Sequence, residues 1–344
     1  MRTIEYLSPT SISKFEENLE EFYLQYLAED RPDKLPQTQP MSVGSAFDAY
    51  AKSFLHERLF GKGSNPRFEF DTLFTTQVEE QNRDFAIEAG KHCFDSYRVS
   101  GALSDLFMMM ENAQGEPQFE FEVKGVVDRY RDGYKGKVGD VVFMGKPDAY
   151  FKNKDGHSVM LDWKVNGYCG NYNTSPKKGY VRVRDGWTAT VAKPSRNANA
   201  QHKDAFVQKV NGVDINIAYR LETAMPDWAR QLAIYSWLVG EPVGSDFICC
   251  IDQLVCKPTG DKPLIRVAEH RGQIGKEFQE ALIDCAKQMW ETVRSDHIFR
   301  EMSLEDSQQR CKTLDKYASG LKGDTEDDEW FRNTTRMGDS YQGG

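Results

Sequence analysis

The residues best suited to chemistry are two aspartates and a lysine near the middle of the chain. Asp148 follows Gly145-Lys146-Pro147, and thirteen residues separate it from the string Asp162-Trp163-Lys164. In a β-strand, residues two apart share a face, so Asp162 and Lys164 point the same way while Trp163 points into the core. Two carboxylates placed together form a hard oxygen site suited to Mg²⁺ or Mn²⁺, which binds phosphodiesters.

A hairpin is expected to bring Asp148 alongside the other two residues. Short apolar runs at 141–151 and 159–165 predict two strands, and the polar stretch from Asn153 to Gly156 between them predicts a turn. Hydrolysis of a phosphodiester needs a water that is nucleophilic near neutral pH, and a bound metal ion provides it by lowering the pKa of that water. Lys164 can orient or deprotonate the water.

Three further motifs accompany these acids in a fixed order along the chain. They are Ser11-Ile12-Ser13-Lys14-Phe15 opening an N-terminal helix, Gly44-x-x-x-Asp48 on a helix before the strands, and Gln231-x-x-x-Tyr235 on a helix after them. Together with Pro147-Asp148 and Asp162-x-Lys164, the set resembles the PD-(D/E)xK nuclease superfamily, specifically its RecB-type exonuclease branch, over roughly residues 7 to 255. The catalytic string alone is a weak signal, whereas the ordered set is much stronger.

This resemblance implies a role for each residue of the central string. Asp148 and Asp162 would ligate Mg²⁺ or Mn²⁺, the backbone carbonyl of Trp163 would complete the metal's ligands, and Lys164 would handle the water. The alternative is that the two aspartates are ordinary acids near a turn, with Lys164 as their surface ion-pair partner.

The resemblance also implies roles for residues on the helices. Gln231 and Tyr235 lie four apart on one helical face, where they would steady the site or contact substrate phosphate. Alternatively, they form a polar pair on a half-buried helix. Asp48 stands where many RecB-type members place a histidine as an additional metal ligand, which implies a harder site. The alternative for Asp48 is an acid in the first turn of a helix, which the macrodipole favours.

The expected fold class is α/β, a restriction-endonuclease-like central mixed sheet flanked by helices, forming a RecB-type nuclease domain. We expect this domain at residues 1–320, with a basic insertion at about 166–222 and an acidic, mobile tail at 321–344. Helices are expected at 14–27 behind a Ser13/Glu16 capping box, behind Ser42 and Gly44, at 77–98, after Pro226, and around Phe278 to Met289. Alternation predicts a strand at 119–124, and an apolar run predicts another at 246–255.

The basic insertion is the expected contact for DNA. From Gly170 to Val210 there are eight Lys or Arg residues against two acids, although the whole chain has a net charge of −9. Basic residues interleaved with aromatic rings suit single-stranded nucleic acid. The candidate substrate-binding residues there are Lys177, Lys178, Arg182, Arg184 and Trp187. A solvated flexible loop is the alternative.

Composition excludes several other classes of protein. No eighteen consecutive apolar residues occur and the N-terminus lacks a signal-peptide core, so we expect a cytoplasmic protein without membrane contact, in the host cytoplasm if phage-encoded. Seven cysteines without a Cys-x-x-Cys pair indicate reduced thiols and no iron–sulfur cluster. No Gly-x-x-x-x-Gly-Lys-Ser/Thr string is present, so no ATP site is expected.

The leading functional prediction is metal-dependent exonucleolytic cleavage of DNA in recombination, repair or phage DNA processing. The expected partners are DNA, as a single strand or an end, and a recombination or replication protein. A structure-selective endonuclease of the same superfamily is one alternative. A non-catalytic DNA-binding or assembly module that kept the fold is another.

Overall fold

A computed structural model describes most of the chain. The described residues are 4–29, 36–119, 123–127, 141–166, 168–169, 180–185, 188–191, 207–210, 213–216, 220–224, 226–244, 246–258, 264–295 and 299. The chain divides into two compact units: the first comprises 1–36, 129–139 and 287–344, and the second comprises 37–128 and 140–286. The predicted acidic tail lies outside the described residues. All of the described candidate site residues lie in the second unit.

The first unit begins with short helices where one continuous helix was predicted. Helix α1 (Pro9–Glu17) starts five residues before the predicted position, because Ser8 accepts from the Ser11 N–H and Ser11 completes the capping box. The Ser13/Glu16 capping box is therefore wrong. At Asn18 the helix ends, and the Asn18 side chain caps α2 (Leu19–Phe22), which continues into the π-helical turn η1 (Tyr23–Leu27).

The second unit opens with four α-helices. These are α3 (Gln39–Phe60), α4 (Phe70–Gln77), α5 (Arg83–Ser100) and α6 (Ala102–Glu111), with single 3₁₀ turns η2 (Pro66–Phe68) and η3 (Glu80–Asn82) between them. Thr38 caps α3 and Pro40 occupies its first turn, so the helix begins earlier than predicted and Asp48 lies in its third turn. The first-turn alternative for Asp48 is thereby wrong. The helix predicted at 77–98 is α5, which begins six residues later than predicted because α4 ends at Gln77 and the chain turns between Val78 and Asn82.

Eleven strands occur in the described residues, all in the second unit. They are β1 (Gln114–Phe119), β2 (Val123–Val127), β3 (Val141–Gly145), β4 (Ala149–Lys152), β5 (Ser158–Asn166), β6 (Tyr180–Asp185), β7 (Thr188–Val191), β8 (Val207–Val210), β9 (Val213–Asn216), β10 (Phe247–Lys257) and β11 (Leu264–Gly272). Seven form one sheet in the order β1-β4-β5-β10-β11-β6-β7, while β2–β3 and β8–β9 form separate hairpins. Because β5 and β10 run parallel and the other pairs antiparallel, the sheet is mixed, as predicted.

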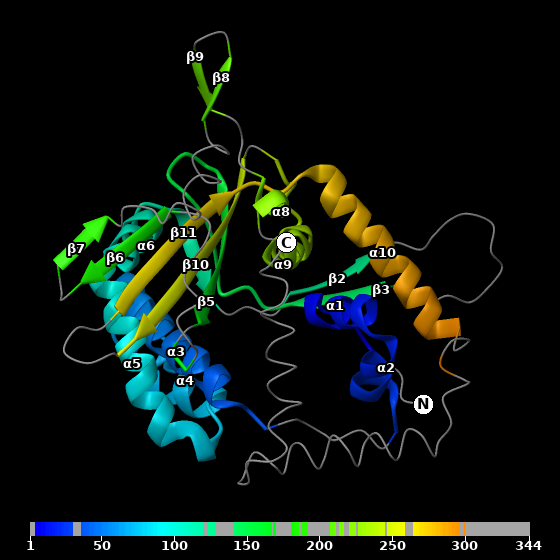
Figure 1. Cartoon of the computed structure of the whole chain (residues 1–344), viewed down its shortest axis with the longest axis horizontal. Coiled ribbons are helices and arrows are strands. Elements are labelled where there is room, and N and C mark those ends of the chain that lie inside the picture. The colour runs from blue at the N-terminus through cyan, green and yellow to red at the C-terminus, as the bar shows by residue number, and fades with distance from the viewer. Residues whose placement is uncertain are drawn as a thin grey trace. The chain divides into compact units, whose positions relative to one another are not determined.

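Helices cover both faces of this sheet, which confirms the α/β class. Figure 1 shows α3 and α5 lying along one side of β5, β10 and β11, with α9 (Pro226–Leu238) on the other. The first face buries Leu161 and Trp163 of β5 in one core cluster, and the second buries Met160 of β5 against α9. The short helix α8 (Leu221–Ala224) precedes α9, and α10 (Lys276–Ser295) follows β11.

Several predicted strands are interrupted or extended in the structure. The run at 141–151 is two strands, because β3 pairs with β2 while β4 pairs with β5. The two ends of the strand predicted at 119–124 belong to different strands, since Phe119 is in β1, which pairs with β4, and Val123 is in β2, which pairs with β3; residues 120–122 lie outside the described residues. Part of the predicted insertion forms β6 and β7 at the edge of the main sheet. Among the described residues, no helix has the length and apolar composition needed to cross a bilayer.

Candidate active site

The candidate site lies where strand β4 separates from strand β5. The hairpin turn at 153–157, with Gly156 at a φ of 85°, joins the two strands, and their pairing runs from Lys152 opposite Ser158 to Ala149 opposite Leu161. Gly156 tolerates this positive φ because it has no Cβ. Asp148 is the residue immediately before β4 in the chain. Because of this register, the Asp148 carboxylate lies beside the backbone of β5, one position beyond the pair formed by Ala149 and Leu161.

The Asp148 carboxylate replaces a strand partner for Trp163. Its Oδ2 accepts a hydrogen bond of 2.9 Å from the Trp163 N–H. In a strand, the N–H and C=O of one residue point to the same side, so the Trp163 carbonyl also faces the gap that β4 has left. The indole of Trp163 is buried in the core, with 7% of the residue exposed, as predicted.

Asp162 is a buried carboxylate that faces α9. Only 4% of the residue is exposed. The pKa of its carboxyl is raised to about 6, mainly by burial and also by the negative charge of Asp148, while the Lys164 ammonium opposes the shift. The Lys164 Nζ lies 2.6 Å from Oδ2 of Asp162, which confirms that these two residues share a face. The contact is an ion pair and not a hydrogen bond, and Oδ2 accepts no hydrogen bond from the described residues.

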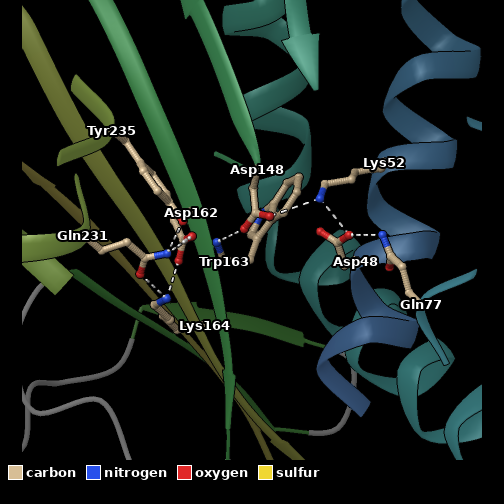
Figure 2. A network of polar contacts seen from close by, with 9 residues as sticks. All are labelled: Asp48, Lys52, Gln77, Asp148, Asp162, Trp163, Lys164, Gln231 and Tyr235. Carbon is tan, nitrogen blue, oxygen red and sulfur yellow. Dashed lines mark hydrogen bonds and ion pairs between the residues drawn. The ribbon is translucent and has the colours of Figure 1, made fainter. Parts of the chain in front are cut away.

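Gln231 of α9 ties the acid to the lysine. Its Oε1 accepts from the Lys164 ammonium at 2.7 Å, and its Nε2 donates to Asp162 Oδ1 at 3.0 Å and to the Tyr235 hydroxyl at 2.9 Å. An amide is the side chain that supplies an acceptor and two donors from one group, so Gln231 satisfies all three neighbours. Figure 2 shows these contacts converging on Asp162.

Tyr235 follows Gln231 by one helical turn and presents a protonated hydroxyl. Burial raises the pKa of this hydroxyl to about 12, and the negative charge of Asp162 adds to the shift. The ring packs directly on Gly145, where an added Cβ would lie 2.6 Å from the Tyr235 ring. Gly145 therefore allows α9 to approach the site closely.

On the other side of Asp148, a second contact chain leads into helix α3. The Lys52 ammonium lies 3.0 Å from Asp148 Oδ1 and 2.7 Å from Asp48 Oδ2, and the Gln77 amide donates to the same Asp48 oxygen at 3.0 Å. Figure 2 shows Lys52 between the two aspartates. Metal ligation by Asp48 stays a prediction, and its nearest cation in the structure is Lys52.

A cavity of about 500 Å³ reaches this side of the site. Its wall includes Gly44, Asp48, Lys52, Lys146, Asp148 and Trp163. An added Cβ at Gly44 would have nothing within 4 Å, so this glycine faces open space. The cavity gives a ligand access to Asp148 from the direction of α3.

The donor atoms around Asp148 and Asp162 fit a hard divalent cation. The buried Asp162 Oδ2 accepts no hydrogen bond from the part of the chain that the structure describes, Asp148 contributes a second carboxylate, and the Trp163 carbonyl faces the same gap. Oxygen ligands that leave room for water suit Mg²⁺ or Mn²⁺. Within the described residues, no three His, Cys, Asp or Glu side chains group closely enough to hold a metal ion by themselves, so any metal bound here would need water molecules or the carbonyl to complete its coordination.

Sequence reasoning missed Lys52 and Gln77, which hold Asp48. Lys52 follows Asp48 by four residues on a helix, and this i,i+4 spacing of opposite charges was the available signal. Gln77 gave no comparable signal, because its contact with Asp48 spans 29 positions along the chain.

The predicted DNA-contacting residues are only partly described. Lys177, Lys178 and Trp187 lie outside the described residues. The backbone positions of Arg182 and Arg184 lie on β6, where they pair with Val267 and Ile265 of β11. Their contact with DNA stays a prediction. Of the free cysteines described, four are buried and two exposed, and none is in a disulfide.

Comparisons with known proteins give distant similarities. No protein family matches the sequence, and no curated protein matches it significantly. The chain is similar to the crystal structure of a "Putative exonuclease" from Eubacterium rectale, with a TM-score of 0.39 and 13% identity over 86% of this chain and 87% of the other. It is also similar to the crystal structure of SSO0001, with a TM-score of 0.26 and 12% identity over 80% and 88%. Both TM-scores are low, so neither similarity indicates the function of this chain.

Proposed function

We propose that this protein is a metal-dependent DNA nuclease of the PD-(D/E)xK type, with a RecB-like domain and exonuclease activity. The observation that carries the proposal is the contact network around Asp162. Three separate segments of the chain supply Asp148, the pair Asp162 and Lys164, and the pair Gln231 and Tyr235, and all meet through hydrogen bonds or ion pairs. Surface acids near a turn would not be buried and cross-linked in this way.

The proposed reaction is hydrolysis of a DNA phosphodiester. The water oxygen forms a bond to phosphorus while the bond from phosphorus to one ester oxygen breaks, giving a phosphomonoester and a free hydroxyl. A divalent ion bound by Asp148, Asp162 and the Trp163 carbonyl would lower the pKa of the attacking water and balance the charge that develops on phosphate. Asp162 and Asp148 supply the negative charge that holds such an ion.

Lys164 would orient the water or a phosphate oxygen. One ammonium hydrogen is donated to Gln231, and the ion pair with Asp162 helps to hold the group in one place, so its other hydrogens can point at the reacting atoms. Tyr235 keeps its proton, since the pKa is raised to about 12, and can donate to a phosphate oxygen. A preset arrangement of donors lowers the reorganisation needed in the transition state.

DNA is proposed as the substrate because the predicted basic segment would offset the acidic charge of the chain. Phosphate contacts position nucleic acid without reading its bases. Replacing Lys177, Lys178, Arg182 and Arg184 together by Ser should weaken DNA binding and flatten its salt dependence by a slope of roughly 0.7 per lost contact on a single strand. Trp187→Ala should weaken single-strand binding with the salt slope unchanged, because stacking releases no counterions. Unchanged affinity and slope in the four-site variant would make a protein partner the better assignment for this segment.

The test of the activity uses end-labelled linear and covalently closed circular DNA with Mg²⁺, Mn²⁺ or EDTA. Release of mononucleotides from ends alone supports the exonuclease, nicking of circles supports the endonuclease alternative, and binding without cleavage supports the non-catalytic alternative. Asp148→Ala, Asp162→Ala and Lys164→Ala should each reduce cleavage to background. Asp95→Ala is the matched control, because Asp95 is also paired with a lysine and its side chain is 21% exposed, as is that of Asp148.

A further inference from the structure

We propose that Lys52 acts as a built-in cation between Asp48 and Asp148 and thereby limits the site to one divalent metal ion. This inference rests on the proposed function. Its basis is the position of the ammonium, which lies 2.7 Å from Asp48 Oδ2 and 3.0 Å from Asp148 Oδ1. A second metal ion that bridged these two carboxylates would have to occupy the same space.

The burial of Lys52 makes the position of its ammonium well defined. Only 3% of the side chain is exposed, and it reaches the site from the fourth turn of α3. A buried ammonium needs paired partners, because its desolvation is otherwise very costly. Its ion pairs are with two acids of the site, Asp48 and Asp148, so moving Lys52 away would leave both carboxylates without this counter-charge.

The hydrogen-bond capacity of the two carboxylates points the same way. Asp48 Oδ2 accepts a hydrogen bond from the Gln77 amide and forms an ion pair with the Lys52 ammonium, so these two groups crowd this oxygen. From the described residues, Asp148 instead accepts one hydrogen bond on each oxygen, from Lys52 on Oδ1 and from the Trp163 N–H on Oδ2, which leaves a lone pair on each for a metal ion. Asp148 is thus placed to bind metal together with Asp162, while Asp48 is held by Lys52.

Charge balance within the network favours a single ion. When the three aspartates Asp48, Asp148 and Asp162 are ionised, they contribute −3, and Lys52 and Lys164 contribute +2, giving −1 (Figure 2). One divalent ion changes this to +1, which a phosphodiester with one negative charge neutralises. Two ions would give +3, and Lys146 on the cavity wall would add to the excess.

The experiment counts Mn²⁺ ions bound to the protein without DNA, by calorimetry and by the electron paramagnetic resonance of free Mn²⁺. The wild-type chain should bind one Mn²⁺, and Asp162→Ala should lose it. Asp48→Asn should keep one Mn²⁺ with an affinity within about threefold of wild type. No Asp162-dependent Mn²⁺ in the wild type would overturn the proposed metal site itself. Two ions in the wild type, or loss of the ion in Asp48→Asn, would overturn only the assignment of Lys52.

Variants of Lys52 provide the second arm. Lys52→Met keeps much of the length and apolar stem but removes the charge, and it should bind a second Mn²⁺. The double variant Lys52→Met/Asp48→Asn should return to one ion, and Lys52→Arg, which keeps the charge, should also bind one. If Lys52→Met folds only with metal, its melting temperature should continue to rise at higher Mn²⁺ concentrations, where a second and weaker site fills. A single ion in folded Lys52→Met, with no such further rise, would contradict the proposal.

Discussion

The indole Nε1 of Trp163 lies 3.3 Å from the Tyr97 hydroxyl and donates a hydrogen bond to it. Tyr97 in turn donates to Asp252 of β10, and Asp252 accepts from Arg271 of β11 at 2.6 Å. This buried chain fixes the residue whose backbone N–H binds Asp148. The position of the candidate metal ligands therefore depends on residues on the face of the sheet opposite Asp162 and Lys164.

Removing the Tyr97 hydroxyl should disturb this support. Tyr97→Phe keeps the ring that packs against Phe47 but removes one donor from the buried Asp252 carboxylate. We expect a loss of about 1–3 kcal/mol in the free energy of unfolding. We also expect kcat to fall with KM nearly constant, because Trp163 positions the site without binding substrate. Denaturant unfolding and steady-state kinetics measure both.

Tyr50→Phe is the matched control for this variant. The Tyr50 hydroxyl donates to the Ile87 carbonyl at 3.4 Å in an exposed position. Its loss should change neither stability nor turnover appreciably. Equal effects of the two substitutions on kcat would show that the Tyr97 network does not position the site.

Gln231→Ala should lower activity more than stability. The variant removes the amide that links Lys164, Asp162 and Tyr235, and loss of such supporting contacts typically costs 10–100-fold, so we expect kcat/KM to fall by about this factor. Gln279→Ala is the comparison, because that amide also contacts α9 but bonds to Ala233 and Ser236 away from the site. It should lower the melting temperature and leave kcat unchanged. If Gln231→Ala lowered the melting temperature and left kcat/KM unchanged, Gln231 would contribute to stability and not to activity.

Gly145→Ala should reduce activity without altering any charged residue. The added methyl group would collide with the Tyr235 ring at 2.6 Å, and such overpacking costs about 1–3 kcal/mol. We expect α9 to shift, which would lengthen the contacts of Gln231 and lower kcat. Gly44→Ala is the control for stability, because its methyl group meets open space and should stabilise α3 by about 0.5–1 kcal/mol. Full activity in folded Gly145→Ala would show that close approach of α9 is not needed.

Asp162 should make the metal-free protein lose stability as the pH rises. Burial raises the pKa of its carboxyl from 3.8 to about 6 in the folded state. A carboxyl whose pKa is raised by folding favours the folded state below its unfolded pKa, and this contribution is lost as the pH rises through its folded pKa. In EDTA, the wild type should therefore lose stability relative to Asp162→Asn between pH 3.8 and about 6.

Thermal melting of the two proteins at pH 4 and pH 7.5 measures this difference. Mg²⁺ should restore wild-type stability at pH 7.5 and leave Asp162→Asn nearly unaffected, since only the wild type keeps the full ligand set. If wild type and Asp162→Asn differed in stability by the same amount at both pH values, the pKa of the Asp162 carboxyl would not be raised by folding.

The sequence predicted those parts of the site whose signals are local. The two-residue spacing of Asp162 and Lys164 predicted a shared face, and the turn at Asn153 to Gly156 predicted the hairpin that carries Asp148. The spacing of Gln231 and Tyr235 placed them on one side of a helix. Each of these predictions used a period or a turn within a few residues.

The remaining parts depend on contacts between distant segments. Tyr97 and Asp252 are 155 positions apart, and nothing near either residue indicates the other. The start of α3 was misplaced because Ser42 also fits a cap, while the structure uses Thr38 followed by Pro40. Strand β11 was not predicted, since it mixes polar residues with apolar ones, and His270 finds its buried partner Gln253 of β10 only in the assembled sheet.

The hairpin between β4 and β5 makes the length of a surface turn matter for chemistry. Residues 153–157 separate the paired Lys152 and Ser158, and the Asn153 side chain accepts from the Asp155 and His157 N–H groups. Insertions and deletions are usually tolerated in exposed turns. Here, losing one residue would slide β4 along β5 by one position and turn its side chains to the opposite face. Asp148 would then leave the Trp163 N–H, so among relatives this loop should vary in composition but keep its length.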